Sequence, residues 1–134
     1  RNRIVLSSLY LGTGHLEQNL VNQLSSSLEK NDDLKIKILL DYSRGLRGEK
    51  NSKTILLPLI NNYFKRINLS LYHTPSLRGV LKKFLPERTN ETIGVLHMKI
   101  YLFDNNLIIS GANLSNDYFT NRQDRYILIK DCEN

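Results

Sequence analysis

The chain has 134 residues, and its 19 Lys and Arg against 13 Asp and Glu give a formal net charge of +6 and a pI near 9.5. This length fits one domain, and the positive balance favours partners that carry phosphate. The single cysteine, Cys132, excludes a disulfide framework, and no apolar run approaches the roughly 18 residues of a membrane-spanning helix. Because the chain starts without Met inside an apolar segment, we expect a piece of a longer protein.

The first predicted strand covers residues 4–11, whose sequence IVLSSLYL is apolar enough for burial on both faces. A Gly-Thr-Gly turn at residues 12–14 ends it, and leucines at every fourth position from Leu16 to Leu28 predict a helix. The turn has two interpretations. Its N–H groups can cradle phosphate, or it is a tight turn in which Thr13 caps the helix. The second is favoured because no fuller fingerprint surrounds the glycines.

A basic loop at residues 43–53 follows a second predicted strand at residues 34–42. Ligands of open α/β sheets collect beyond the carboxyl ends of the strands, and arginine matches phosphate with a two-pronged set of donors. From composition alone, a solvated charge run is an equally good interpretation. The basic residues of the loop are Arg44, Arg47, Lys50 and Lys53, and the candidate phosphate ligands are Arg44, Arg47, Lys50, Asn51 and Ser52.

The next two elements are a helix and a strand. The helix starts at about Lys53, with Asn51 or Ser52 as its cap, and Pro58 is expected to delay or kink it. The strand is predicted at residues 67–72, where INLSLY alternates apolar and polar positions.

A further helix is predicted at residues 75–85, with Thr74 as its cap and Pro75 in its first position. It carries an apolar stripe on one side and basic residues on the other. Packing of the stripe against the sheet is favoured, and the alternative is a helix that lies on an anionic membrane surface. The basic residues are Arg78, Lys82 and Lys83.

Residues 95–113, with the sequence VLHMKIYLFDNNLIISGAN, predict a β-hairpin. Residues two apart share a face of a strand, so His97 and Lys99 stand together, opposite a face that carries Met98. We expect a three-residue loop at residues 104–106, because Asp and Asn tolerate positive φ. This register places Lys99 opposite Gly111, places His97 opposite Asn113, and buries the face of Met98, Ile108 and Ser110. A two-residue turn would move Asn113 to the Met98 side.

A short irregular stretch at residues 115–122 and a closing strand at residues 123–130 complete the chain. The order of three strand and helix pairs followed by a hairpin predicts one α/β domain over residues 1–134, a sandwich with a mixed central sheet flanked by helices.

The hairpin carries His97, Lys99 and Asp104 in the pattern H-x-K-x4-D, followed by Gly111 and Asn113. This pattern resembles the signature of the phospholipase D superfamily. The superfamily more often shows G-S-x-N after the motif, with the Asn one residue further from the Asp, whereas this chain has S-G-A-N.

The residue types suit attack on a phosphodiester. A neutral imidazole at His97 can attack phosphorus and form a phosphohistidine, while Lys99 and Asn113 stabilise the non-bridging oxygens. Asp124 lies where the superfamily usually carries an acidic residue, and we expect it to hold the imidazole in the right tautomer. Asp104 belongs to the same motif. We expect it to form the turn of the hairpin rather than to act as an acid or a base. The structural alternative is a half-buried histidine beside a lysine that reaches solvent.

One histidine cannot easily serve both sides of the phosphorus, so the motif supplies half of a site. The resemblance implies that a second H-x-K-x4-D half comes from the missing part of the chain or from a dimer mate.

Longer segments narrow the resemblance. Four segments are similar to the eukaryotic mitochondrial phosphatidylglycerophosphate synthases. They are LSSLYLGTG, DYSRGLRGEKNSKT, LYHTPSLRGVL and the stretch from LPERTNETIG through the motif to NRQDRY. This family implies transfer of a phosphatidyl group from CDP-diacylglycerol to glycerol 3-phosphate, with release of CMP, in cardiolipin biosynthesis. It implies no metal, cofactor or nucleic acid, and a peripheral place on the anionic surface of the mitochondrial inner membrane.

In that scheme, the basic loop together with Arg122 and Arg125 would hold the pyrophosphate or the phosphate of the acceptor. Two other functions stay open: a metal-independent nuclease or phospholipase of the same superfamily, and a non-catalytic phosphate-binding module.

Overall fold

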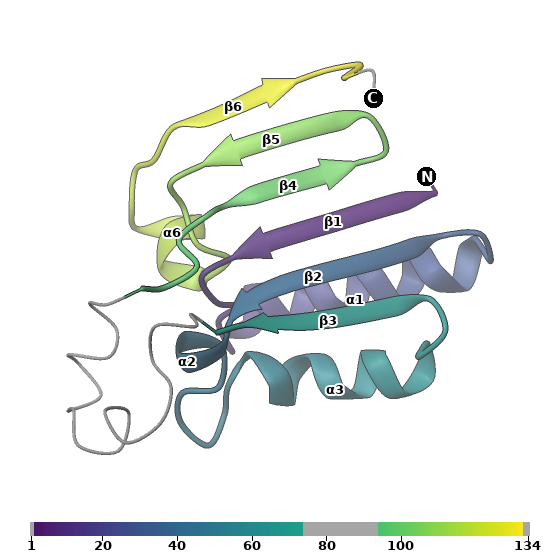
Figure 1. Ribbon diagram of the computed structural model, residues 1–134, viewed down its shortest axis with the longest axis horizontal. Coiled ribbons are helices and arrows are strands. Elements are labelled where there is room, and N and C mark those ends of the chain that lie inside the picture. Colours follow the sequence, from purple (N-terminus) through teal and green to yellow (C-terminus); the bar gives the residue numbers. More distant parts are fainter. Residues whose placement is uncertain (1, 74–93, 133–134) are drawn as a thin grey trace.

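The computed structural model describes residues 2–73 and 94–132, and within them six strands form one mixed sheet in the order β3-β2-β1-β4-β5-β6 (Figure 1). The first three strands are parallel, and each of β4, β5 and β6 runs antiparallel to the preceding neighbour in that order. The strands are β1 (Arg3–Ser8), β2 (Lys35–Asp41), β3 (Ile67–Tyr72), β4 (Ile100–Phe103), β5 (Asn106–Ser110) and β6 (Tyr126–Ile129). The predicted α/β class with a mixed sheet is confirmed.

Two longer helices, α1 (His15–Lys30) and α3 (Ser52–Asn62), contact each other and pack on one face of the sheet. The shorter helices α2 (Tyr42–Gly45) and α6 (Asn116–Thr120) lie at the end of the sheet where β1, β2 and β3 terminate (Figure 1). Within the described ranges, no helix is both long enough and apolar enough to cross a bilayer.

The core lies between the two longer helices and the parallel strands. Burial alternates along β2. Ile36, Ile38 and Leu40 are buried, whereas Lys35 and Lys37 on the other face are exposed. In β1 the described residues also alternate at first, since Ile4 and Leu6 are buried and Arg3 and Val5 are not. Burial of the first strand on both faces is therefore not observed over this part. The helices contribute Val21, Leu24, Leu28, Leu56 and Leu59.

The two helix starts differ in their caps. Asn51 caps α3 in a capping box, in which its side chain accepts from the Thr54 N–H and the Thr54 hydroxyl accepts from the Asn51 N–H. This confirms one of the two expected caps, and α3 continues through Pro58. At α1 the cap residue is Gly14 without a side-chain hydrogen bond, so the expected Thr13 cap is wrong.

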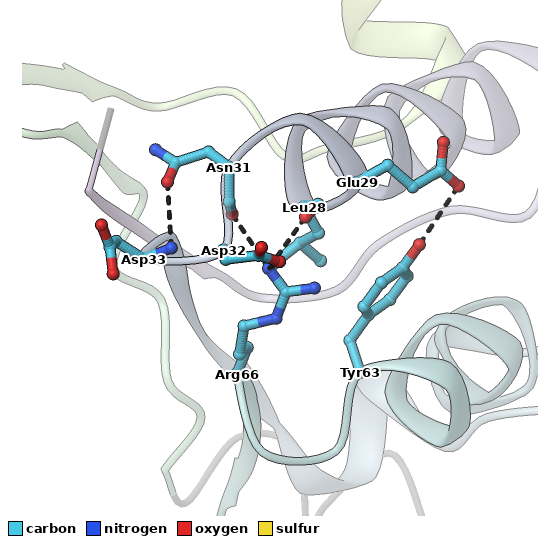
Figure 2. Close-up of polar contacts among 7 residues, drawn as sticks. All are labelled: Leu28, Glu29, Asn31, Asp32, Asp33, Tyr63 and Arg66. Carbon is cyan, nitrogen blue, oxygen red and sulfur yellow. Dashed lines mark hydrogen bonds and ion pairs between the residues drawn. The ribbon is translucent and has the colours of Figure 1, made fainter.

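The end of α1 is fastened to the turn before β3 by Arg66 (Figure 2). Its Nη1 donates to the carbonyls of Leu28 at 2.8 Å and Asn31 at 2.9 Å, and it lies 3.5 Å from the carboxylate of Asp32. Tyr63 adds a hydrogen bond of 3.1 Å from its hydroxyl to Glu29. The last carbonyls of a helix have no partner within the helix, and here a guanidinium satisfies two of the carbonyls at this end.

The hairpin differs from its predicted register. Its loop has two residues, Asp104 and Asn105, and Phe103 pairs with Asn106. Asp104 takes a φ of 55°, and its carboxylate accepts the N–H groups of Asn2 and Arg3, so contacts with the start of the chain favour the shorter loop.

The buried face of the first hairpin strand is the reverse of the expected one, whereas the second strand keeps its expected face, with Ile108 against the core. Tyr101 pairs with Leu6 on one side and with Ile108 on the other, so all three lie on the face covered by the helices. Lys99, two residues before Tyr101, is also buried, whereas Met98 on the other face is 42% exposed. A shift of one residue turns every side chain to the opposite face.

The other predicted elements have mixed outcomes. The strand at residues 67–72 is observed with the same bounds, and the closing strand is shorter than expected. The stretch at residues 115–122, expected to be irregular, contains α6. The helix predicted at residues 75–85, with its cap and its basic face, lies outside the described residues.

Candidate active site

The candidate catalytic residues gather at one end of the sheet. His97 and Lys99 precede β4, Asn113 follows β5, and Asp124 precedes β6, at the end where β1, β2 and β3 terminate (Figure 1). In a sheet with parallel strands this is the end at which ligands bind. Asp104 lies at the opposite end of β4.

His97 and Lys99 lie side by side, as the sequence predicts. The Nζ of Lys99 is 2.9 Å from the Nε2 of His97 and donates to the His97 carbonyl at 3.1 Å. His97 is exposed, whereas Lys99 is only 3% exposed. An ammonium has only donors, so Lys99 can donate to Nε2 when that nitrogen carries no proton. An unprotonated Nε2 is the form that can attack phosphorus.

The ammonium of Lys99 lies in a partly desolvated place. Burial lowers the pKa of Lys99, and the nearby carboxylate of Asp124 opposes that shift. The Asp124 Oδ1 accepts the N–H of Gly111 at 3.2 Å and that of Arg125 at 2.7 Å. Within the described ranges no hydrogen bond joins Asp124 to His97, so its visible electrostatic partner is Lys99.

Gly111 permits this approach of Asp124. A Cβ atom at Gly111 would lie 2.8 Å from both carboxylate oxygens, closer than such contacts occur in proteins. The glycine of the motif therefore makes room for the carboxylate.

Asn113 is buried beside the same end of β4. It is 5% exposed, and its Oδ1 accepts no hydrogen bond from the residues that the structure describes. Since β5 ends at Ser110, strand alternation does not determine the direction of this side chain. The preceding residue, Ala112, is held at both ends, because its N–H donates to the Ser110 hydroxyl at 3.0 Å and its carbonyl accepts from the Tyr101 hydroxyl at 2.8 Å.

Tyr101 and Ser8 support this segment and were not among the residues predicted from the sequence. Burial raises the pKa of Tyr101 to about 12, against an opposing hydrogen bond with Ser8. Ser8 is fully buried, and its hydroxyl also accepts the N–H of Leu114 at 3.5 Å. The only sequence signal is a pair of serines at the end of an apolar strand.

Asp41 is a second residue that the sequence-based reasoning missed. It ends β2 and is 2% exposed. Its Oδ2 accepts the N–H of Leu96 at 2.9 Å, and its Oδ1 accepts the N–H of Arg44 at 3.0 Å and the hydroxyl of Ser43 at 2.6 Å. One carboxylate thus ties the residue before His97 to the basic loop.

Asp104 has the contacts of a turn-forming residue. Besides accepting two N–H groups with its carboxylate, it donates its N–H to the Arg3 carbonyl at 2.8 Å, and its own carbonyl accepts from Nη2 of Arg3 at 3.0 Å. These bonds fasten the hairpin to β1, far along the strand from His97.

The basic loop forms a pocket with the turn that follows β1. The pocket has a volume of about 280 Å³, and the guanidinium of Arg44 lies 5.6 Å from the ring centre of Tyr10 at its edge. All five loop residues predicted as phosphate ligands line it, whereas Lys53 does not. The lining residues are Tyr10, Leu11, Gly12, Thr13, Arg44, Arg47, Lys50, Asn51 and Ser52.

Two of the predicted ligands use their side chains to hold the pocket walls. The Ser52 hydroxyl donates to the Leu11 carbonyl at 2.7 Å and accepts the Leu11 N–H at 3.0 Å. The Asn51 amide donates to the carbonyl of Gly48 at 2.8 Å, while its oxygen caps α3. The Ser52 contacts join the loop to the turn that follows β1, and the Asn51 contact holds the loop together.

The Gly-Thr-Gly turn encloses a carboxylate of the protein itself. Glu17 is 2% exposed, and its Oε1 accepts the N–H of Asn116 at 2.6 Å. A Cβ at Gly12 would overlap this oxygen, and one at Gly14 would lie 2.7 Å from Oε2. Since the carboxylate lies at the start of α1, this geometry agrees with the tight-turn interpretation rather than with a phosphate cradle formed by the helix.

The two other predicted phosphate ligands lie outside the pocket. Arg122 is engaged on α6, 3.7 Å from the carboxylate of Asp117 and 4.8 Å above the ring of Tyr118. Arg125 is exposed next to Asp124. Across residues 2–73 and 94–132, no group of three or more His, Cys, Asp or Glu has a metal-binding arrangement.

Sequence comparison with known proteins identifies relatives of this chain. No family model matches the chain. The chain is 60% identical to mitochondrial CDP-diacylglycerol--glycerol-3-phosphate 3-phosphatidyltransferase of Mus musculus and 57% identical to that of Homo sapiens, in each case over 98% of its own length. It is 51% identical to the enzyme of Saccharomyces cerevisiae over 97%. The chain spans about a quarter of each relative's length. These identities confirm the resemblance noted from the motifs.

A solved structure shares the fold. The chain matches phosphatidylserine synthase of Haemophilus influenzae with a TM-score of 0.74 and 24% identity, over 98% of this chain and 28% of the other.

Proposed function

Because this chain is homologous to one segment of the mitochondrial CDP-diacylglycerol--glycerol-3-phosphate 3-phosphatidyltransferases, we propose that it provides half of the active site of such an enzyme. The reaction would move a phosphatidyl group from CDP-diacylglycerol to glycerol 3-phosphate and release CMP. The observation that supports this most directly is the contact of 2.9 Å between the Nζ of Lys99 and the Nε2 of His97, at the ligand-binding end of the sheet.

In the first step, the lone pair on Nε2 of His97 attacks the phosphorus that bears diacylglycerol. A nitrogen–phosphorus bond forms, the bond to the bridging oxygen breaks, and CMP leaves with that electron pair. The Lys99 ammonium moves its hydrogen bond from Nε2 to a non-bridging oxygen, because nitrogen can no longer accept it. Asn113 donates its amide to the same oxygens, and Asp124 stabilises the positive charge of the pair.

In the second step, a hydroxyl of glycerol 3-phosphate attacks the phosphohistidine. An oxygen–phosphorus bond forms, the nitrogen–phosphorus bond breaks, and His97 is regenerated. The hydroxyl proton goes to a second general base, which protonates the leaving CMP in the first step. A second H-x-K-x4-D half, from the rest of the chain or from a dimer mate, supplies this group.

Cationic residues hold the phosphates of the substrates in this scheme. Arg44, Arg47 and Lys50 line the pocket beside the reacting centre, and Arg122 and Arg125 lie on the segment around Asp124. Asn51 and Ser52 shape the pocket, and Asp104 keeps the hairpin in register with β1.

The reaction places the protein at a membrane surface. The relatives from mouse and human are named as mitochondrial, and the lipid donor resides in a bilayer. A net charge of +6 favours contact with anionic lipid, so we place the protein on the surface of the mitochondrial inner membrane, with the basic residues Arg78, Lys82 and Lys83 as a contact.

The test uses the full-length protein and CDP-diacylglycerol labelled on the phosphate next to diacylglycerol. An acid-labile label on the protein is expected, which disappears in His97→Ala and is transferred to glycerol 3-phosphate. Transfer to water instead would identify a phospholipase or nuclease. If no label forms on the protein and His97→Ala keeps its function, the chain is a phosphate-binding module.

A further inference from the structure

We propose that the pocket of Arg44, Arg47 and Lys50 holds the phosphate of the acceptor, a small phosphomonoester dianion, and not the pyrophosphate of the nucleotide donor. This inference rests on the proposed function and assigns one substrate to one part of its site. Four features of the described residues support it.

The first feature is the set of residues that line the pocket. None of its lining residues is His97, Lys99, Asn113 or Asp124. The two phosphorus atoms of a pyrophosphate share one oxygen, so groups that hold the second phosphate must lie in the same cavity as His97. In glycerol 3-phosphate, carbon atoms and an ester oxygen separate the attacking hydroxyl from the phosphorus. A neighbouring pocket suits that longer connection.

The second feature is size. Pockets for drug-sized ligands have volumes of roughly 300–1,000 Å³. At about 280 Å³, this pocket falls just below that range and suits a phosphate with a few carbon atoms.

The third feature is the chemistry of the walls. Asn51 and Ser52 hold the pocket walls with their side chains, and Arg44, Arg47 and Lys50 line the same pocket. Three cations around one pocket match a doubly charged phosphomonoester. Thr13, in the turn after β1, also lines the pocket and is exposed, so its hydroxyl can meet a glycerol hydroxyl.

The fourth feature is the rigid link between the pocket and the nucleophile. The Asp41 carboxylate accepts the N–H of Arg44 with one oxygen and the N–H of Leu96, the neighbour of His97, with the other. Tyr10 lies under the guanidinium of Arg44 and donates a hydrogen bond of 3.4 Å to Ser115, two residues after Asn113. A phosphate bound here is therefore held at a set position relative to His97.

The test measures steady-state kinetics of the full-length protein with Arg47→Gln and Lys50→Gln. Both side chains are exposed at the pocket, so neither change disturbs the core. We expect KM for glycerol 3-phosphate to rise at least about tenfold in each variant, as for loss of one charged contact, with KM for CDP-diacylglycerol within about twofold. The matched control is Lys53→Gln, which removes an exposed lysine of α3 that does not line the pocket and is expected to change neither constant.

A second measurement needs no variant. Inorganic phosphate is expected to inhibit the unchanged protein competitively with glycerol 3-phosphate and not with CDP-diacylglycerol. A rise in KM for CDP-diacylglycerol alone, competition of phosphate with that substrate, or unchanged constants in both variants would overturn the assignment. Failure of the proposed function is distinct, because the unchanged protein would then form no phosphohistidine.

Discussion

The Nζ of Lys99 lies 2.9 Å from the Nε2 of His97, and this contact joins a buried side chain to an exposed one. Taking an ammonium out of water is costly unless it finds acceptors, and Lys99 has the imidazole and the carbonyl of the same residue within reach. In the proposed reaction, oxygens of the bound phosphate would replace the imidazole as the partner of Lys99.

Lys99→Met is expected to abolish activity without loss of stability. Methionine keeps much of the length of the side chain and removes an amine whose charged form is desolvated, so the melting temperature should stay within about 3 °C or rise. The rate of CMP release should fall at least about 100-fold, because a stabilising charge in the transition state is gone. Calorimetry and a CMP-release assay of the full-length protein test this. A marked drop in melting temperature would instead give Lys99 a structural role.

Asp124→Asn is expected to move the basic limb of the pH profile of kcat to lower pH. Burial lowers the pKa of Lys99, and the charge of Asp124 opposes that shift, so removal of the charge lowers the pKa further. Activity needs the ammonium and is lost as pH rises through its pKa, which therefore occurs earlier in the variant. The check is kcat between pH 6 and about pH 10. Asp124→Glu keeps the charge and should keep the limb in place, and an unmoved limb in Asp124→Asn would contradict the pairing with Lys99.

Gly12→Ala is expected to destabilise the protein by about 1 to 3 kcal/mol, because the new methyl group would overlap Glu17 Oε1. The same change in a Glu17→Ala background should cost much less, with a coupling energy above about 1 kcal/mol. Urea unfolding of the four proteins of the cycle measures this. Equal costs in both backgrounds would show that Glu17 is not what excludes a side chain at Gly12.

Arg66→Met is expected to lower the free energy of unfolding by about 1 to 3 kcal/mol, since two carbonyls at the end of α1 lose their donor (Figure 2). Lys65→Met is the control, because it removes an exposed neighbouring cation outside this contact. Activity measured below the melting temperature should be unchanged, since Arg66 lies away from the reacting centre. Similar stabilities of the two variants would argue against the capping role.

Several features of the site were predictable from local patterns. Spacing by two predicted that His97 and Lys99 lie side by side, and the contact between their side chains confirms this, although both residues precede β4 instead of lying within it. The position of the basic loop after β2 predicted residues at the carboxyl end of the sheet, where the pocket is found. The Asn51 cap of α3 followed from the preference of Asn for that position.

Other features depended on contacts between distant parts of the chain. The length of the hairpin loop was predicted wrongly because the carboxylate of Asp104 binds the N–H groups of Asn2 and Arg3, about a hundred residues away in sequence. That contact accompanies the two-residue loop, and the pairing of Tyr101 with Leu6 of β1 puts Lys99 on the helix side of the sheet and Met98 on the other side.

The sequence by itself determined the α/β class, the order of the strands and of the two longer helices in the described parts, and the proximity of His97 and Lys99, because each of these depends on periodicity or on spacing of a few residues. Only the tertiary structure decided which face of the hairpin is buried, that Asp41 joins Arg44 to the neighbour of His97, and that Glu17 fills the turn at Gly12. The physical reason is that a carboxylate leaving water binds whichever N–H groups the fold brings within about 3 Å, and sequence distance does not limit that choice.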